Sequence, residues 1–164
     1  MMPYALLAAA LVAVDQIVKY LVRTYIPLGE SIPFLPHIMD LTYVQNTGAA
    51  FSLFEEQTWV LTLVSLAASA FLAVLLIKKW ITRHPLGRAL LAVVLAGAAG
   101  NLIDRALLGF VTDMFQTTFM NFAVFNVADI CVVLGGIGFC AYYLLLFDRL
   151  EGKEAGHDAP GTDG

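Results

Sequence analysis

The chain has 164 residues and a formal net charge of −4, and 60% of its residues are hydrophobic while 13% are charged. A soluble domain is typically about 45–50% apolar and about 25% charged, so this composition excludes an ordinary soluble domain and predicts an integral membrane protein. It also offers no basic surface of the kind that binds nucleic acid.

Four segments are long and apolar enough to cross a bilayer as helices. A hydrocarbon core of roughly 30 Å requires about 20 such residues. The segments are residues 4–23, 58–77, 86–103 and 124–147. We expect one all-α membrane domain over residues 1–150, followed by a disordered cytoplasmic tail over 151–164, which is polar and rich in glycine.

The basic residues predict the orientation of these spans. The stretch "KKWITRHPLGR" (78–88), which runs from the second span into the start of the third, holds four of the nine Lys and Arg residues: Lys78, Lys79, Arg83 and Arg88. Basic residues of short loops stay in the cytoplasm. Both termini are therefore expected inside, and the segments 26–57 and 105–123 outside.

The first span carries an acid and a base, Asp15 and Lys19, which are four residues apart. Acid before base is the favourable order for an ion pair along a helix. The pair is expected to neutralise itself and to dock this helix against its neighbours; a direct catalytic role is the alternative.

The outer segment 26–57 contains three prolines and β-prone pieces such as "LTYV". We expect strands followed by a turn at Asn46-Thr47-Gly48. The apolar content of this module suggests that it rests on the membrane surface.

The stretch "GAAGNLIDR" closes the predicted third span. Its Asp104 and Arg105 follow Asn101 by three and four residues, so all three side chains can lie on one side of a helix. Asp104 beside Arg105 is expected to stay ionised as a paired charge, which is a poor proton shuttle. We interpret the cluster as a scaffold; a charged cap at the interface is the alternative.

Two further acids follow on the outer side. Asp113 lies in "GFVTDMF", whose apolar residues suggest a segment that folds back onto the membrane after Gly109; a solvated turn is the alternative. Asp129 ends "FNVAD", shares a helix face with Asn126, and is expected about five residues into the fourth span, roughly 8 Å below the interface. An unpaired acid at that depth is a candidate functional residue.

The topology predicts that Asp104, Asp113 and Asp129 converge at the outer leaflet. Two carboxyl groups in contact do not both ionise, so one keeps a proton while the other acts as a base. Such a pair can activate a water for attack on an amide. This is aspartic-protease chemistry, and the scattered histidines predict no metal site.

Five short motifs resemble, in order, the motif blocks of the lipoprotein signal peptidases, also called signal peptidase II. They are "DQIVK" (15–19), "NTGAAF" (46–51), "GNLIDR" (100–105), "VTD" (111–113) and "FNVAD" (125–129). The resemblance implies a bacterial inner-membrane aspartyl protease with four spans, an extracytoplasmic β-cradle and a short surface helix. It implies Asp113 and Asp129 as the catalytic pair.

The resemblance also implies the partners. The substrate would be a prolipoprotein whose lipobox cysteine carries a diacylglyceryl group, cut before that cysteine, with membrane lipids around it. No cofactor is implied, and we expect a monomer. Residues that bind the substrate or order the site would be Asn46, Gly48, Asn101, Asp104, Arg105 and Asn126.

Two other functions are compatible with the composition. Intramembrane acids also relay protons in transporters, but a relay should cross the bilayer, whereas these acids gather at one side. A non-enzymatic membrane scaffold would tolerate the loss of Asp113 or Asp129.

Overall fold

The computed structural model describes residues 1–48 and 58–150. Its long helices are α1 (Met2–Tyr25), α2 (Thr58–Lys78), α3 (Pro85–Leu108) and α4 (Val127–Leu145), and its strands are β1 (Ser31–Leu35), β2 (Met39–Asn46) and β3 (Val111–Thr117). All four helices are long and apolar enough to span a membrane. The predicted class, a four-span helical membrane protein with a small sheet, is confirmed.

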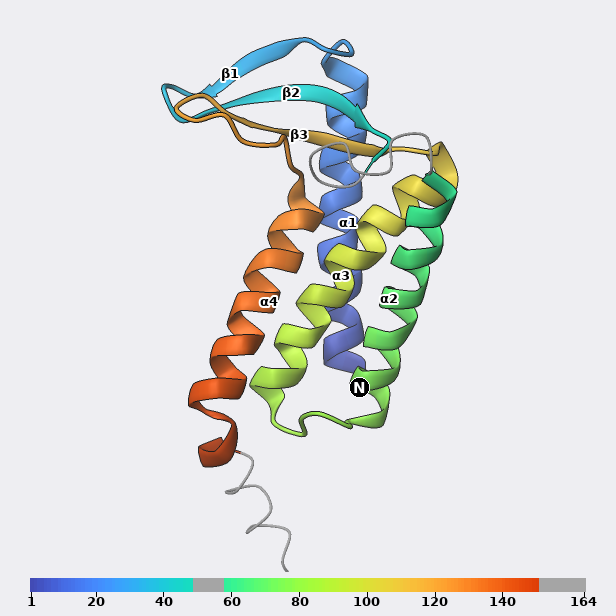
Figure 1. Cartoon of the computed structure of the whole chain (residues 1–164), viewed down its shortest axis with the longest axis vertical. Coiled ribbons are helices and arrows are strands. Elements are labelled where there is room, and N and C mark those ends of the chain that lie inside the picture. Colours follow the sequence, from blue (N-terminus) through green and yellow to red (C-terminus); the bar gives the residue numbers. More distant parts are fainter. Residues whose placement is uncertain (49–57, 151–164) are drawn as a thin grey trace, which may run out of the picture.

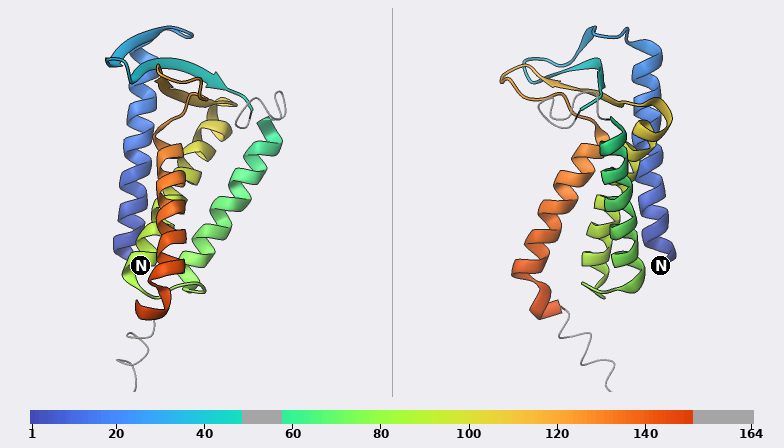
Figure 2. Two further views of the ribbon diagram at one scale, coloured as in Figure 1. Left: turned by 60° about the vertical axis from the view of Figure 1, so that its left-hand side comes forward. Right: turned by 45° about the vertical axis from the view of Figure 1, so that its right-hand side comes forward.

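The helix α3 is the centre of the bundle, because it packs against α1, α2 and α4. The sheet lies across one end of the helices, and the N-terminus and the α2–α3 loop lie at the other end (Figures 1 and 2). Most residues of the four helices are not buried inside the protein, as expected for apolar helices that face lipid.

Glycines let α3 and α4 approach closely. A Cβ at Gly97 would collide with the carbonyl oxygen of Ala128, and one at Gly135 would lie 2.8 Å from Val94. Small residues at such contacts are typical of membrane helix pairs. The close approach brings the first turn of α4 against the outer half of α3.

The helix that holds the predicted third span, residues 86–103, is longer than that span. Helix α3 continues to Leu108 and ends at Gly109, whose φ of 79° is left-handed and whose N–H bonds to the carbonyl of Arg105. Glycine adopts this conformation without steric cost. Asn101, Asp104 and Arg105 therefore lie within the helix instead of capping it.

The sheet is antiparallel with the order β1-β2-β3. Strands in the outer segment were predicted, but the strand β3 was not. Its first four residues are buried and show no alternation of apolar and polar side chains, so the period-2 signal of a strand is absent. Pairing with β2, which sets Val44 opposite Asp113, makes this segment a strand.

The sheet is attached to the end of α1 through an apolar cluster of Val22, Ile26, Tyr43 and Met114. Burial of such side chains stabilises the contact by roughly 1.5–3 kcal/mol each. The cluster holds β2 and β3 over the end of the bundle, where the predicted site residues gather.

Two predictions concern residues outside the described part of the chain. The outer segment forms strands and turns over residues 26–48, and the expected short surface helix would have to involve residues 49–57, which lie outside it. The tail over 151–164 also lies outside the described residues. Both stay predictions.

Candidate active site

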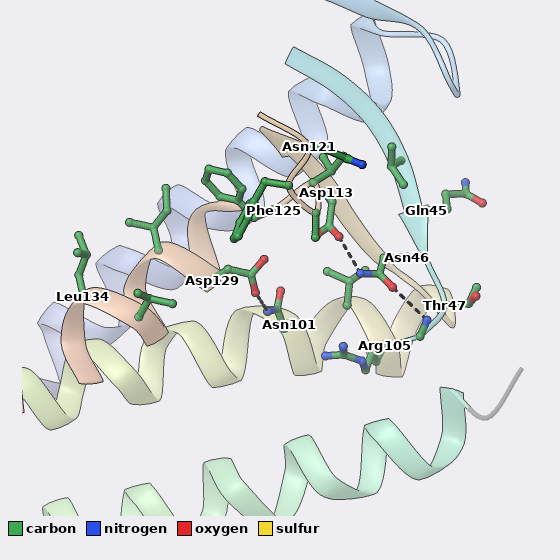
Figure 3. A pocket seen from close by; sticks show the side chains of 18 residues that line it. Gln45, Asn46, Thr47, Asn101, Arg105, Asp113, Asn121, Phe125, Asp129 and Leu134 are labelled. Atoms are coloured by element: carbon green, nitrogen blue, oxygen red, sulfur yellow. Dashed lines mark hydrogen bonds between the residues drawn. The ribbon is translucent and has the colours of Figure 1, made fainter. Parts of the chain in front are cut away.

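A cavity of about 920 Å³ lies between the sheet, α3 and α4. Figure 3 shows polar side chains from β2, α3, β3 and α4 directed toward it. The predicted site residues that line it are Asn46, Gly48, Asn101, Arg105, Asp113 and Asp129.

Asp113 lies on β3 and is 2% exposed. Its Oδ2 accepts a 2.9 Å hydrogen bond from Asn46 Nδ2, and its Oδ1 accepts one of 2.6 Å from Asn126 Nδ2. Burial raises the pKa of Asp113 to about 6, and the charge of Asp129 also raises it, whereas the bonds from the two amides act in the other direction. This carboxyl therefore holds a proton more readily than an exposed one.

Asp129 lies in the first turn of α4, not five residues into the span as predicted. Asn126 is the N-cap: its side chain accepts from Asp129 N, and Asp129 Oδ2 accepts from Asn126 N at 3.0 Å. This reciprocal capping box starts the helix at Val127. The other oxygen, Oδ1, accepts a 2.8 Å hydrogen bond from Asn101 Nδ2.

Asn126 joins the two aspartates, although it is fully buried and does not line the cavity. Its side-chain amide donates to Asp113 and its backbone amide donates to Asp129. All four carboxylate oxygens of the pair thus accept an N–H from a named amide. The arrangement holds two carboxyl groups at one cavity.

The expected turn after β2 orients Asn46. The backbone N–H of Gly48 donates a 3.0 Å hydrogen bond to Asn46 Oδ1. Because a backbone N–H only donates, the oxygen of the Asn46 amide faces Gly48 and its NH₂ group faces Asp113. The Asn46-Thr47-Gly48 turn is therefore part of the site.

The predicted pairing of Asp104 with Arg105 was wrong. Asp104 lies 3.5 Å from Lys19 Nζ and accepts a 2.9 Å hydrogen bond from Thr112 N, while Arg105 lines the cavity and donates a 3.4 Å bond to Ser65 Oγ. Neighbouring residues on a helix point about 100° apart, so the two charges face different elements.

The predicted ion pair of α1 is confirmed, with Lys19 Nζ 2.9 Å from Asp15 Oδ2 and both side chains buried. Lys19 also donates a 3.0 Å hydrogen bond to Asn101 Oδ1. Asn101 thus connects the pair to Asp129, because its oxygen accepts from Lys19 and its NH₂ group donates to Asp129.

Sequence reasoning missed the loop after β3, which supplies Asn121 and Phe122 to the cavity. No spacing signal marks these residues, since a loop follows no periodic pattern. A smaller cavity of about 290 Å³ adjoins the site between α2, α3 and α4, and it shares Asn101, Arg105 and Asp129 with the larger one.

The family match and the most similar relatives that were compared all indicate the same family of proteins. Residues 7–146 match the family described as signal peptidase (SPase) II, peptidase family A8. The chain is 44% identical over 153 residues to a lipoprotein signal peptidase of Enterococcus faecalis, covering 92% of each. It is 38% identical to one of Brevibacillus brevis, covering 92% of this chain and 97% of the relative.

The fold also resembles solved structures. One bacterial membrane enzyme, determined by the in meso method at 2.3 Å, aligns with a TM-score of 0.80 and 28% identity over 90% of each chain. A second, determined at 1.9 Å, aligns with a TM-score of 0.80 and 27% identity over 89% of this chain and 95% of that one.

Proposed function

The chain belongs to the signal peptidase II family and is a protease, and from this premise we propose that it is an aspartic endopeptidase that removes signal peptides from prolipoproteins. The proposed substrate carries a diacylglyceryl group on its lipobox cysteine and is cut before that cysteine. The observation that carries the proposal is the pair Asp113 and Asp129, which line one cavity and are joined by Asn126.

The proposed chemistry needs one proton on the pair. The ionised carboxylate takes a proton from a water, whose oxygen attacks the scissile carbonyl carbon. The protonated carboxyl then donates to the amide nitrogen as the C–N bond breaks. The burial that raises the pKa of Asp113 to about 6 supports its role as the proton-holding partner, with Asp129 as the base.

The cavity suits a substrate with one polar and one apolar part. The α4 side chains Ile130, Val133 and Leu134 form an apolar wall, opposite the polar residues of β2 and α3. Arg105 can donate to a substrate carbonyl oxygen from the cavity floor. We infer that the signal peptide, itself a membrane helix, reaches the carboxylates laterally while the acyl chains on the lipobox cysteine stay in lipid.

The basic loop supports the proposed orientation. Lys78 and Lys79 lie at the end of α2 remote from the sheet, as the arrangement in Figure 1 shows. Basic residues favour the cytoplasmic side, so the site would face the outer side of the bacterial plasma membrane. There it would meet proteins that have already been exported and lipidated.

The test is a gel-shift assay with purified protein and a diacylglyceryl-modified prolipoprotein, with the unmodified precursor as the control substrate. Wild type should shorten only the modified precursor, and Asp113→Asn and Asp129→Asn should fold, insert and leave it uncut. Wild-type turnover by either variant would show that Asp113 and Asp129 are not the catalytic pair. Efficient cleavage of the unmodified precursor would contradict the proposed substrate class.

A further inference from the structure

The backbone amides that immediately precede the two aspartates are each held by a buried carboxylate. Ala128 N donates a 2.9 Å hydrogen bond to Asp15 Oδ1, and Thr112 N donates one of 2.9 Å to Asp104 Oδ2. Asp15 and Asp104 are each 1% exposed. One carboxylate thus holds α4 next to Asp129, and the other holds β3 next to Asp113.

Lys19 joins these two carboxylates. Its ammonium is 0% exposed and lies 2.9 Å from Asp15 Oδ2 and 3.5 Å from Asp104 Oδ2. Gln16 Nε2 donates to both acids as well, at 3.1 Å each. We call Asp15, Gln16, Lys19 and Asp104 the anchoring cluster.

The cluster also orients Asn101. Lys19 Nζ donates to Asn101 Oδ1 at 3.0 Å, and Asn126 Nδ2 donates to the same oxygen at 3.1 Å. Since an ammonium has no acceptor, the oxygen of Asn101 faces Lys19. The NH₂ group of Asn101 is then left to face Asp129.

Gly100 allows Asp15 to reach across α3 to α4. A Cβ at this position would lie 2.6 Å from Asp15 Oδ2 and 3.2 Å from the Cβ of Ala128. Any larger residue would therefore push the carboxylate away from Ala128 N. The contact between α1 and the first turn of α4 depends on this missing side chain.

We propose that Asp15 and Asp104, bridged by Lys19, are positioning residues that set the separation of Asp113 and Asp129. The inference rests on the proposed function, because it concerns how that pair shares its proton. Repulsion between two carboxylates falls with distance, so their separation decides how far apart the two protonation steps lie. Apolar residues would stabilise a buried contact at least as well as an ion pair, which favours a geometric role for these charges.

Other charged groups face the cluster and the pair from each neighbouring element. Arg23 of α1 lies 3.9 Å from Asp104, and Arg105 of α3 lines the same cavity as Asp113 and Asp129. The variants below keep all of these groups, so a changed pH profile reports on the cluster.

The experiment compares Asp15→Asn and Gly100→Ala with wild type in detergent or vesicles, using the lipidated precursor. In wild type the two donors reach different oxygens of Asp15, Ala128 N at Oδ1 and Lys19 at Oδ2, and in Asp15→Asn one of these two atoms becomes an NH₂ group, which cannot accept. We expect kcat per folded molecule to fall about 10- to 100-fold, with KM unchanged. The bell-shaped pH profile of kcat should become narrower, because a wider separation weakens the coupling of the two acids.

The matched control is Gly135→Ala, which disturbs the same α3–α4 interface at Val94 without contact with the cluster. It should lower Tm and keep the wild-type pH profile. If wild type cleaves the precursor but Asp15→Asn and Gly100→Ala keep its kcat and pH profile, the positioning inference is overturned and the proposed function stands. If wild type does not cleave it, the proposed function itself fails. Should Gly100→Ala not fold, Asp15→Asn decides alone.

Discussion

The side-chain amide of Asn126 donates a 2.6 Å hydrogen bond to Oδ1 of Asp113. The same residue caps α4 and donates its backbone N–H to Asp129. One buried asparagine therefore has two separable roles, the start of a helix and the connection of two acids.

Substitution of Asn126 separates these roles. Asn126→Ser keeps a good N-cap but removes the amide that donates to Asp113 and to Asn101 Oδ1, so we expect a modest fall in Tm with activity lowered about 10- to 100-fold. Asn126→Ala removes both and should also lose about 1 kcal/mol of stability. Thermal scans and the gel-shift assay check the pair of variants; wild-type activity of Asn126→Ser would show that the bond to Asp113 is dispensable.

The raised pKa of Asp113 predicts a pH-dependent stability. Its folded pKa of about 6 lies above the ordinary value of 3.8, so between these values the folded state binds more protons than the unfolded state. Stability should therefore fall as pH rises through this window, by roughly 3 kcal/mol for this group. The measurement compares the Tm of wild type with that of Asp113→Asn from pH 3.5 to 7. As the pH rises, the Tm of wild type should fall relative to that of the variant. A flat difference would contradict the raised pKa.

Asp104→Asn should impair cleavage less than Asp113→Asn or Asp129→Asn. An asparagine at position 104 can still accept from Thr112 N, whereas loss of an acid or base from the pair should cost roughly 10³-fold or more. Initial rates on the lipidated precursor distinguish the three variants. An equal loss at all three positions would reopen the question of which acids form the pair.

Gly109→Ala should destabilise the protein through its backbone alone. Gly109 has φ +79° and an added Cβ would meet nothing within 4 Å, so the expected loss of about 1–2 kcal/mol comes from the left-handed conformation. Gly136→Ala is the matched control, because its Cβ also meets nothing within 4 Å and it lies within helix α4. The control should be neutral or slightly stabilising; equal Tm values for the two variants would argue against strain at Gly109.

Removal of metal ions should not change the activity. In the proposed mechanism the two carboxyl groups activate the water themselves, so dialysis against EDTA should leave initial rates at the wild-type level. The control is a second dialysis with Mg²⁺ or Zn²⁺ restored. Inhibition by EDTA that is reversed by one of these ions would reveal a metal in the reaction.

Local patterns in the sequence were enough for part of the fold. Each span is an apolar stretch near 20 residues, and the Asp15–Lys19 pair depends on a four-residue spacing within one helix. The Asn46-Thr47-Gly48 turn is likewise local. Motif resemblance, and not spacing, singled out Asp113 and Asp129 from the other acids.

Contacts between segments that are distant in the sequence decided the remaining features of the fold and of the site. The strand β3 exists because β2 pairs with it, and Asp104 turns away from Arg105 because Lys19 of α1 and the amide of Thr112 offer it partners. Asp129 lies in the first turn of α4 because the capping box starts the helix at Val127, although the apolar run from residue 124 predicted an earlier start.

The sequence by itself thus determined that this is a four-span membrane protein with acids near one end, because hydrophobicity and helical spacing act over a few residues. Only the tertiary structure decided which amide meets which carboxylate oxygen. Those hydrogen bonds join residues up to 113 positions apart, and no pattern within a single helix or strand specifies a partner on another.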